Sequence, residues 1–180
     1  MDMTLDLLGE YASPQPNVAI LMVGLPESGK TTLLNKLISN DCDVTTIPPT
    51  NGFKRETIKF EEKYYIFWDI GGFESLRFLW EYYIPNKDAV VFVVDASNLE
   101  VFAMAKEFLH IIMSHDNLNG VQLLVVFNKQ DKTNCATDED LEQQLDLKSL
   151  KQSYRIVRSS AFDRESLKNI MVHLRDMNLF

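Results

Sequence analysis

The eight residues 24–31, GLPESGKT, have the types and the spacing of a loop that binds phosphate groups. They directly follow the apolar run Val18 to Val23, which we expect to form a strand. Glycines let backbone N–H groups turn toward phosphate oxygens, a lysine supplies positive charge, and the final hydroxyl can bind Mg²⁺ at a helix N-terminus. The less favoured alternative is a glycine-rich turn without a ligand. The pattern predicts a nucleotide site with phosphate contacts from Gly24, Pro26, Glu27, Ser28, Gly29, Lys30, Thr31 and Thr32.

A second group of polar residues indicates which base the site reads. The tetrapeptide NKQD, residues 128–131, follows the apolar run Val121 to Phe127 and is expected at the carboxyl end of a strand, where ligands bind in open α/β sheets. The Asp131 carboxylate can accept hydrogen bonds from both the ring N–H and the exocyclic amine of guanine, a donor pair that adenine lacks. We expect the asparagine to brace the loops and the lysine stem to cover the purine face. The base contacts that we predict come from Asn128, Lys129, Asp131, Ser160 and Ala161.

Two segments between these groups have residues suited to sense a third phosphate. Thr50 can supply a second hydroxyl to Mg²⁺ beside Thr31, and Asp69 can hold the metal through water. Asp69 belongs to the segment WDIGG, residues 68–72, in which the Gly72 N–H can approach a phosphate because no side chain blocks it. Loss of that phosphate would release both segments. The predicted metal ligands are therefore Thr31, Thr50 and Asp69.

Over nearly its whole length, the chain resembles an Arf or Arf-like small GTPase of the Ras superfamily. The segments GLPESGKT, PTNGF, WDIGG, NKQD and SSA carry the resemblance in the order that the family has. The Trp before the Asp-x-Gly-Gly pattern favours the Arf branch. The resemblance implies a Mg²⁺-dependent switch that binds GTP and GDP, meets effector proteins in its GTP state, and is controlled by an exchange factor and an activating protein.

The resemblance also implies an effector surface on a hairpin of two strands, Phe53 to Phe60 and Lys63 to Ile70. An aromatic triad of Phe53, Trp68 and Tyr83 would contact effectors together with the segment from residue 73 to 83. In the family this hairpin slides between nucleotide states, and a slip of two residues keeps every side chain on its own face of the sheet. Without the family pattern, ordinary core packing of the three rings would be the favoured interpretation.

One residue departs from the family at the position that matters for hydrolysis. Most members have Gln after the two glycines, where it orients the attacking water, and this chain has Phe73. A phenyl ring has no hydrogen-bond donor or acceptor, so it cannot orient water. Glu74 is a possible substitute for the missing amide. We expect slow GTP hydrolysis, with Gly72, Phe73 and Lys30 as the catalytic positions.

Two other kinds of protein remain as alternatives. A GTP-binding scaffold with negligible turnover is the main one, and Phe73 is its best argument. A P-loop ATPase or small-molecule kinase would need an adenine site, which the tetrapeptide 128–131 contradicts.

Two further segments that contain proline differ from the usual sequence of the family. Pro26 removes one N–H from the phosphate loop, and the neighbouring Glu27 adds a carboxylate, so nucleotide should still bind with slightly lower affinity. The segment Asp43 to Thr50 is longer than in typical Arf proteins, and Pro48 and Pro49 stiffen it. Because proline fixes φ and biases the preceding residue to extended geometry, this pair could either preset the closed switch or hold it open.

The pattern of apolar residues predicts the strands and helices that must position these site residues. The runs predicted to be strands alternate with amphipathic segments predicted to be helices, which indicates an α/β fold. With the hairpin, we expect a six-stranded, mostly parallel sheet with one antiparallel strand and helices on both faces. The predicted helices are Thr31 to Ser39, Leu99 to His115, Asp138 to Leu145 and Arg164 to Met177. Besides the two strands of the hairpin, the predicted strands are Val18 to Val23, Val90 to Val94, Val121 to Phe127 and Tyr154 to Val157.

The chain divides into an N-terminal segment, residues 1–16, and a GTP-binding domain, residues 17–180. Residues 1–12 would be amphipathic as a helix, with an acidic polar face. Position 2 is Asp rather than the Gly that myristoylation needs, and the segment has no Lys or Arg to attract anionic lipid. We therefore expect no lipid anchor and weak or no membrane binding.

The composition of the chain argues against several classes of partner and against some cellular compartments. The formal net charge of −8 argues against nucleic acid as a partner, because phosphate backbones require a basic surface. Two cysteines are too few for a disulfide framework and lack metal-type spacing. No apolar run reaches the ~20 residues that span a bilayer. We expect a cytoplasmic monomer with free thiols.

Overall fold

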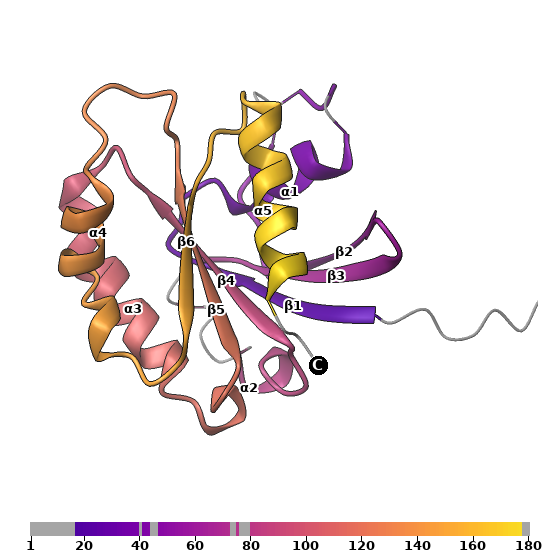
Figure 1. Ribbon diagram of the computed structural model, residues 1–180, viewed down its shortest axis with the longest axis horizontal. Coiled ribbons are helices and arrows are strands. Elements are labelled where there is room, and N and C mark those ends of the chain that lie inside the picture. The colour runs from indigo at the N-terminus through magenta and orange to yellow at the C-terminus, as the bar shows by residue number, and fades with distance from the viewer. Residues whose placement is uncertain (1–16, 40, 44–46, 73–74, 76–79, 178–180) are drawn as a thin grey trace, which may run out of the picture.

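The computed structural model describes residues 17–39, 41–43, 47–72, 75 and 80–177 (Figure 1). One sheet forms its centre. Its strands are β1 Asn17–Val23, β2 Phe53–Phe60, β3 Lys63–Ile70, β4 Ala89–Asp95, β5 Gln122–Asn128 and β6 Tyr154–Arg158. The predicted N-terminal helix within residues 1–16, and the two predicted positions Phe73 and Glu74, lie outside the described residues.

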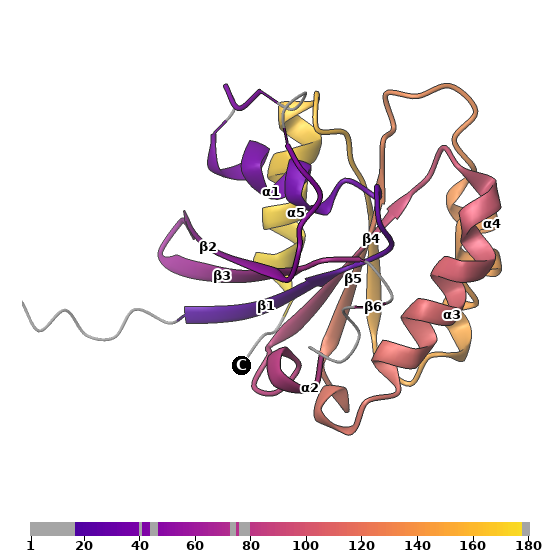
Figure 2. The same cartoon turned by 180° about the vertical axis from the view of Figure 1, so that it is seen from behind.

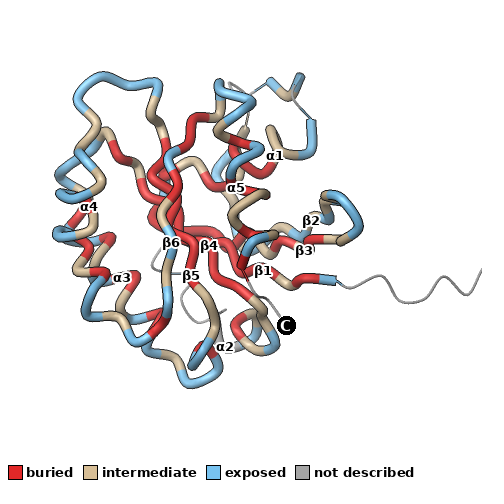
Figure 3. The backbone as a smooth tube through the Cα atoms, viewed as in Figure 1, coloured by how far each residue is buried: buried red, intermediate tan, exposed pale blue. Residues whose placement is uncertain are grey.

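The strand order is β2-β3-β1-β4-β5-β6. The edge strand β2 pairs antiparallel with β3, and all other neighbouring pairs are parallel. The predicted six-stranded sheet with one antiparallel strand is therefore confirmed. The central strands β4 and β5 are buried along nearly their whole length, as Figure 3 shows, because helices cover both of their faces.

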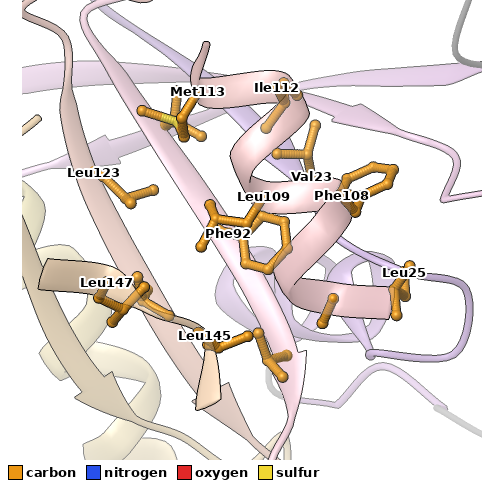
Figure 4. Close-up of a cluster of buried hydrophobic side chains, with 14 of the residues drawn as sticks. Val23, Leu25, Phe92, Phe108, Leu109, Ile112, Met113, Leu123, Leu145 and Leu147 are labelled. Carbon is orange, nitrogen blue, oxygen red and sulfur yellow. The ribbon is translucent and has the colours of Figure 1, made fainter. Parts of the chain in front are cut away.

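Helices lie on both sides of the sheet (Figures 1 and 2). Helices α1 (Lys30–Ile38) and α5 (Arg164–Asp176) cover one face, and α3 (Phe102–Met113) and α4 (Asp138–Gln144) cover the other. Each face has its own cluster of buried apolar side chains. In Figure 4, Phe108 and Leu109 of α3 pack toward Phe92 of β4, and the rings of Phe92 and Phe108 are 5.9 Å apart. The short helix α2 spans Trp80–Tyr83.

Caps explain where these helices begin. The segment predicted as one helix from Leu99 to His115 is a short 3₁₀ turn, η3 (Leu99–Val101), followed by α3, because the Asn98 side chain accepts from the Glu100 N–H and starts a tighter turn there. The predicted cap of α4 is confirmed: the Thr137 hydroxyl accepts from the Asp140 N–H at 3.2 Å and donates to the Asp140 carboxylate at 2.8 Å. Two more 3₁₀ turns are η4 Asp116–Leu118 and η5 Leu147–Ser149.

The sheet brings the carboxyl ends of several strands to one edge. Across β1 and β3, Met22 is in register with Asp69, and across β4 and β5, Asp95 is in register with Asn128. The loops that follow these strands must therefore meet at this edge. Both cysteines are free, and none of the helices in the described part of the chain is long and apolar enough to cross a membrane.

Candidate nucleotide-binding site

The phosphate loop connects β1 to α1 and depends on the close approach of other backbone. Gly29 has φ +91°, and a Cβ there would lie 2.4 Å from the Asn128 Nδ2 atom. Only glycine fits this position, since both the left-handed conformation and the contact exclude a side chain. The loop is thereby held against residues that lie a hundred positions further along the chain. Glu27 also adopts a left-handed conformation, with φ 62°.

Lys30 is the first residue of α1 and lies buried behind the loop. Its ammonium group donates to the carbonyl oxygens of Gly24 at 3.0 Å and Leu25 at 2.9 Å. Burial lowers the pKa of Lys30 to about 8, although the nearby Asp69 carboxylate raises it. The first turn of α1 has no acidic residue and no side-chain cap, so its N–H groups and dipole favour an anion at this end.

Three oxygen-bearing side chains meet beside Lys30. The Thr31 hydroxyl donates to the Asp69 carboxylate, and its oxygen lies 2.7 Å from the Thr50 hydroxyl oxygen. Asp69 is buried, and burial raises its pKa, although hydrogen bonds from Thr31 and the charge of Lys30 lower it. Its Oδ1 atom has no hydrogen-bond partner among the described residues. Two hydroxyls and a carboxylate with an unpaired buried oxygen fit the oxygen ligands that Mg²⁺ prefers.

The loop that contains Thr50 closes over the phosphate region. Ile47, Pro48 and Pro49 line an open cavity of about 200 Å³ together with Lys30, Thr31 and both glycines of the WDIGG segment. The prolines therefore lie beside the phosphate region, and Thr50 after them contacts Thr31. Of the two arrangements that the sequence left open, the structure has the closed one.

Gly72 also lies against the phosphate loop. A Cβ at this position would be 2.5 Å from backbone atoms of Gly24, Leu25 and Pro26. The preceding residue is tied to the Thr50 loop, because the Gly71 N–H donates to the Gly52 carbonyl oxygen at 2.9 Å. The segment after β3 and the loop before β2 thus close on the phosphate loop together.

The base-reading residues meet at the other end of the site. The Asn128 amide donates to the Ser28 carbonyl oxygen at 2.8 Å, which joins the loop after β5 to the phosphate loop. The Ser160 hydroxyl donates to the Asp131 Oδ1 atom at 2.6 Å, which orients the carboxylate. The structure therefore brings Asn128, Asp131 and Ser160 together from two adjacent loops.

The sequence analysis did not include Asp95, which holds Lys129 in place. The Lys129 ammonium lies 2.7 Å from the Asp95 Oδ2 atom, and Ser97 donates to Oδ1 through its N–H and its hydroxyl. Burial raises the pKa of Asp95, but the hydrogen bonds from Lys129 and Ser97 outweigh it and lower the pKa below its usual value. Its place at the end of a buried strand, next to the strand that ends at Asn128, was the available signal.

The aromatic triad consists of Phe53 at the start of β2, Trp68 of β3 and Tyr83 of α2. The ring of Phe53 is 4.5 Å from that of Tyr83 and 5.7 Å from that of Trp68, and the other pair is 5.6 Å apart. Phe53 is exposed, whereas Trp68 and Tyr83 are partly buried and pack against the core. Arg55 and Lys87 each place a positive charge over the Trp68 ring. The cluster is thus both a part of the core and an aromatic surface with a basic rim.

Comparison with known proteins identifies this arrangement. The sequence profile of the ADP-ribosylation factor family matches residues 4–178. A similar solved structure is that of the Arl6 BBS3 small GTPase from Trypanosoma brucei with the bound nucleotide analogue GppNp. It is 29% identical in sequence, has a TM-score of 0.79, and the match covers 89% of this chain and 96% of that one. The phosphate loop, the base-reading loops and a family match over nearly the whole length show that this chain belongs to the ADP-ribosylation factor family of GTP-binding switches.

Proposed function

We propose that this protein is a Mg²⁺-dependent GTP/GDP switch with slow intrinsic hydrolysis. The observation that carries the proposal is the contact of Thr50 with Thr31, whose hydroxyl also donates to Asp69, because this contact joins the loop before β2 to the predicted metal site. Bound Mg²⁺ would neutralise negative charge on the phosphates. Lys30 would turn from the loop carbonyls to a phosphate, and the Gly72 N–H would face the terminal one.

Slow hydrolysis follows from the residue after this glycine. Phe73 has no group that orients water, and Glu27 is the only carboxylate among the residues that line the described phosphate cavity. Negative charge beside a phosphate opposes the accumulation of charge in the transition state, so Glu27 is a poor substitute. GTP should therefore bind and persist.

The hydrolysis proposal predicts that Phe73→Gln raises the single-turnover rate of GTP hydrolysis about tenfold or more, because the amide can position water. GTP affinity should change by less than about twofold. The matched control is Phe73→Leu, which removes the aromatic ring without adding a polar group. Rapid-quench measurements on Mg²⁺-GTP complexes would test both variants. A parent protein as fast as Phe73→Gln would contradict the role assigned to Phe73.

The GTP-binding scaffold remains the second candidate, since Phe73 also suits a protein with no turnover. Nucleotide extracted from the purified protein separates the two. GDP indicates a hydrolase, whereas GTP alone indicates the scaffold. ATP would contradict both.

We also propose that the triad of Phe53, Trp68 and Tyr83 binds effector proteins in the GTP state. The mutual ring contacts and the exposed face of Phe53 support this role. Exchange and activating proteins are expected partners, and a cytoplasmic monomer remains our proposal for its location and state.

A further inference from the structure

Lys54 places a positive charge on the face of β2 that otherwise packs against the core. Side chains alternate along this strand between exposed and partly buried, and Lys54 lies on the partly buried face. Ile58 and Phe60 on the same face pack against the apolar cluster that contains side chains of α1 and α5. A charged group at such a position costs free energy unless polar partners hold it. The partners of Lys54 therefore indicate its role.

The ammonium group of Lys54 joins β2 to the middle of α1. It donates to the Asn35 Oδ1 atom at 2.7 Å. A Glu56 carboxylate oxygen, two positions further on the same face of β2, lies 3.1 Å from the same Nζ atom. The Lys54 and Glu56 side chains are 38% and 31% exposed, so water screens the ion pair and the hydrogen bond makes the more specific contact. The ammonium is thus held between the strand and the helix.

This contact lies one helical turn from the predicted metal ligand Thr31. Thr31 and Asn35 are four positions apart in α1, so they lie on the same face of the helix. Thr50 and Lys54 are also four positions apart, and the Thr50 hydroxyl oxygen lies 2.7 Å from that of Thr31. The segment from residue 50 to 54 is therefore joined to α1 at both of its ends.

We propose that the hydrogen bond between Lys54 and Asn35 is a second tether of the Thr50 loop and favours the arrangement that binds GTP. The inference rests on the proposed function, in which Thr50 binds Mg²⁺ and is released when the terminal phosphate is lost. Release at Thr50 moves the start of β2 away from α1 and breaks the tether. A nucleotide that requires the closed arrangement gains affinity from a contact formed only there, whereas GDP does not. Lys54 and Asn35 are positioning residues that act through Thr50.

The test compares the affinity for GDP with that for a non-hydrolysable GTP analogue, both with Mg²⁺, by titration calorimetry. Lys54→Met retains an unbranched side chain but removes the donor, so the analogue should bind about three- to tenfold more weakly, the effect of one lost hydrogen bond. GDP affinity should stay unchanged. Asn35→Leu removes the acceptor and should give the same loss. The double variant should lose no more than either single one, because each removes the same hydrogen bond.

Two further variants of the pair keep the contact. Lys54→Arg retains a donor and should retain most of the preference for the analogue. Asn35→Asp gives the ammonium a charged acceptor, so the analogue should bind more tightly while GDP does not, and this gain should disappear when Lys54→Met is added. The matched control is Lys59→Met, which removes the same charge from the exposed face of the same strand and should change neither affinity.

Equal losses for both nucleotides in Lys54→Met, or no loss, would overturn the inference, because the contact would then support only the fold or contribute nothing. Tighter binding of the analogue in Lys54→Met would also overturn it, since the ammonium would then act by repelling Mg²⁺. Asn35→Asp decides the question even where Lys54→Met does not fold, and an unchanged ratio of the two affinities there would count against the tether. A parent protein that binds no guanine nucleotide would instead overturn the proposed function itself.

Discussion

At the scale of single residues, the close approach of two backbone segments determines which residue can stand at position 72. Gly72 does not need an unusual φ, yet a methyl group there would meet three backbone atoms of the phosphate loop at 2.5 Å. Backbone atoms cannot rotate away as the end of a side chain can. Any side chain at this position must therefore push the segment after β3 away from the loop.

Gly72→Ala is accordingly predicted to weaken GTP binding more than GDP binding. Overpacking of this kind costs about 1–3 kcal/mol, and the cost falls on the closed arrangement that a terminal phosphate requires. Titration calorimetry with GDP and a non-hydrolysable GTP analogue would measure the two affinities. The control is Gly120→Ala, where φ is +79° but no atom lies within 4 Å of the added Cβ. An equal loss for both nucleotides in Gly72→Ala would show that closure does not involve this glycine.

At the scale of elements, the β2–β3 hairpin is held at both ends by different forces. Near the site, the Gly71 N–H donates to the Gly52 carbonyl oxygen, and the aromatic triad packs alongside. At the far end, Arg175 of α5 donates to the Glu61 carboxylate at 2.6 Å. Both of these charged groups are exposed, and such pairs contribute only about 0–1 kcal/mol. A hairpin that slides by two residues would therefore lose little at its tip.

Another contact between elements gives a pH-dependent prediction. The Tyr154 hydroxyl at the start of β6 donates to the Glu142 carboxylate of α4 at 2.5 Å. Burial and this hydrogen bond raise the pKa of Tyr154 from 10.0 to about 12. Because the folded pKa exceeds the unfolded one, the stabilisation is complete below pH 10 and is lost as pH rises through about 12.

Tyr154→Phe should therefore lower the free energy of unfolding by about 1 kcal/mol near pH 7, the typical contribution of one hydrogen bond. The difference from the parent should shrink as pH approaches 12. Urea unfolding between neutral and alkaline pH would measure it. Tyr82→Phe, in an exposed side chain, is the control and should have no effect at any pH. A difference that stays constant across this range would show that the effect of the substitution does not come from the hydrogen bond of the protonated hydroxyl.

At the scale of the whole molecule, charge sets which surfaces the protein can approach. The formal net charge is −8, and residues 1–16 have three acidic side chains and no Lys or Arg. Each basic residue near an anionic membrane would contribute about 1 kcal/mol of attraction. This segment has no such attraction to balance its acidic groups.

The protein that begins at Met1 should therefore remain in the supernatant when anionic liposomes are sedimented, with GDP or with a GTP analogue. A variant with Asp2→Lys, Asp6→Lys and Glu10→Lys should sediment measurably, because it exchanges three repulsive charges for attractive ones. Neutral liposomes provide the baseline. GTP-dependent sedimentation of the parent would mean that the apolar face alone is sufficient for binding.

The sequence alone was sufficient for the fold class, the family and the order of the site segments. Apolar runs with period two or near-continuous burial, separated by amphipathic segments, require an α/β sheet with covered faces. Local chemistry identified the phosphate loop, since glycine, lysine and threonine at this spacing have few other uses. The cap of α4 was also predictable, because Thr137 and Asp140 lie three positions apart and interact within one turn.

The tertiary structure decided everything that depends on residues far apart in the chain. Whether Pro48 and Pro49 open or close their loop depends on the partner of Thr50, which is Thr31 of α1, and Thr31 in turn donates to Asp69 of β3. Asp95 could be identified as the partner of Lys129 only from the structure, in which the ends of β4 and β5 lie side by side. Short-range patterns encode elements, whereas a site is made by the ends of strands that only the folded sheet brings together.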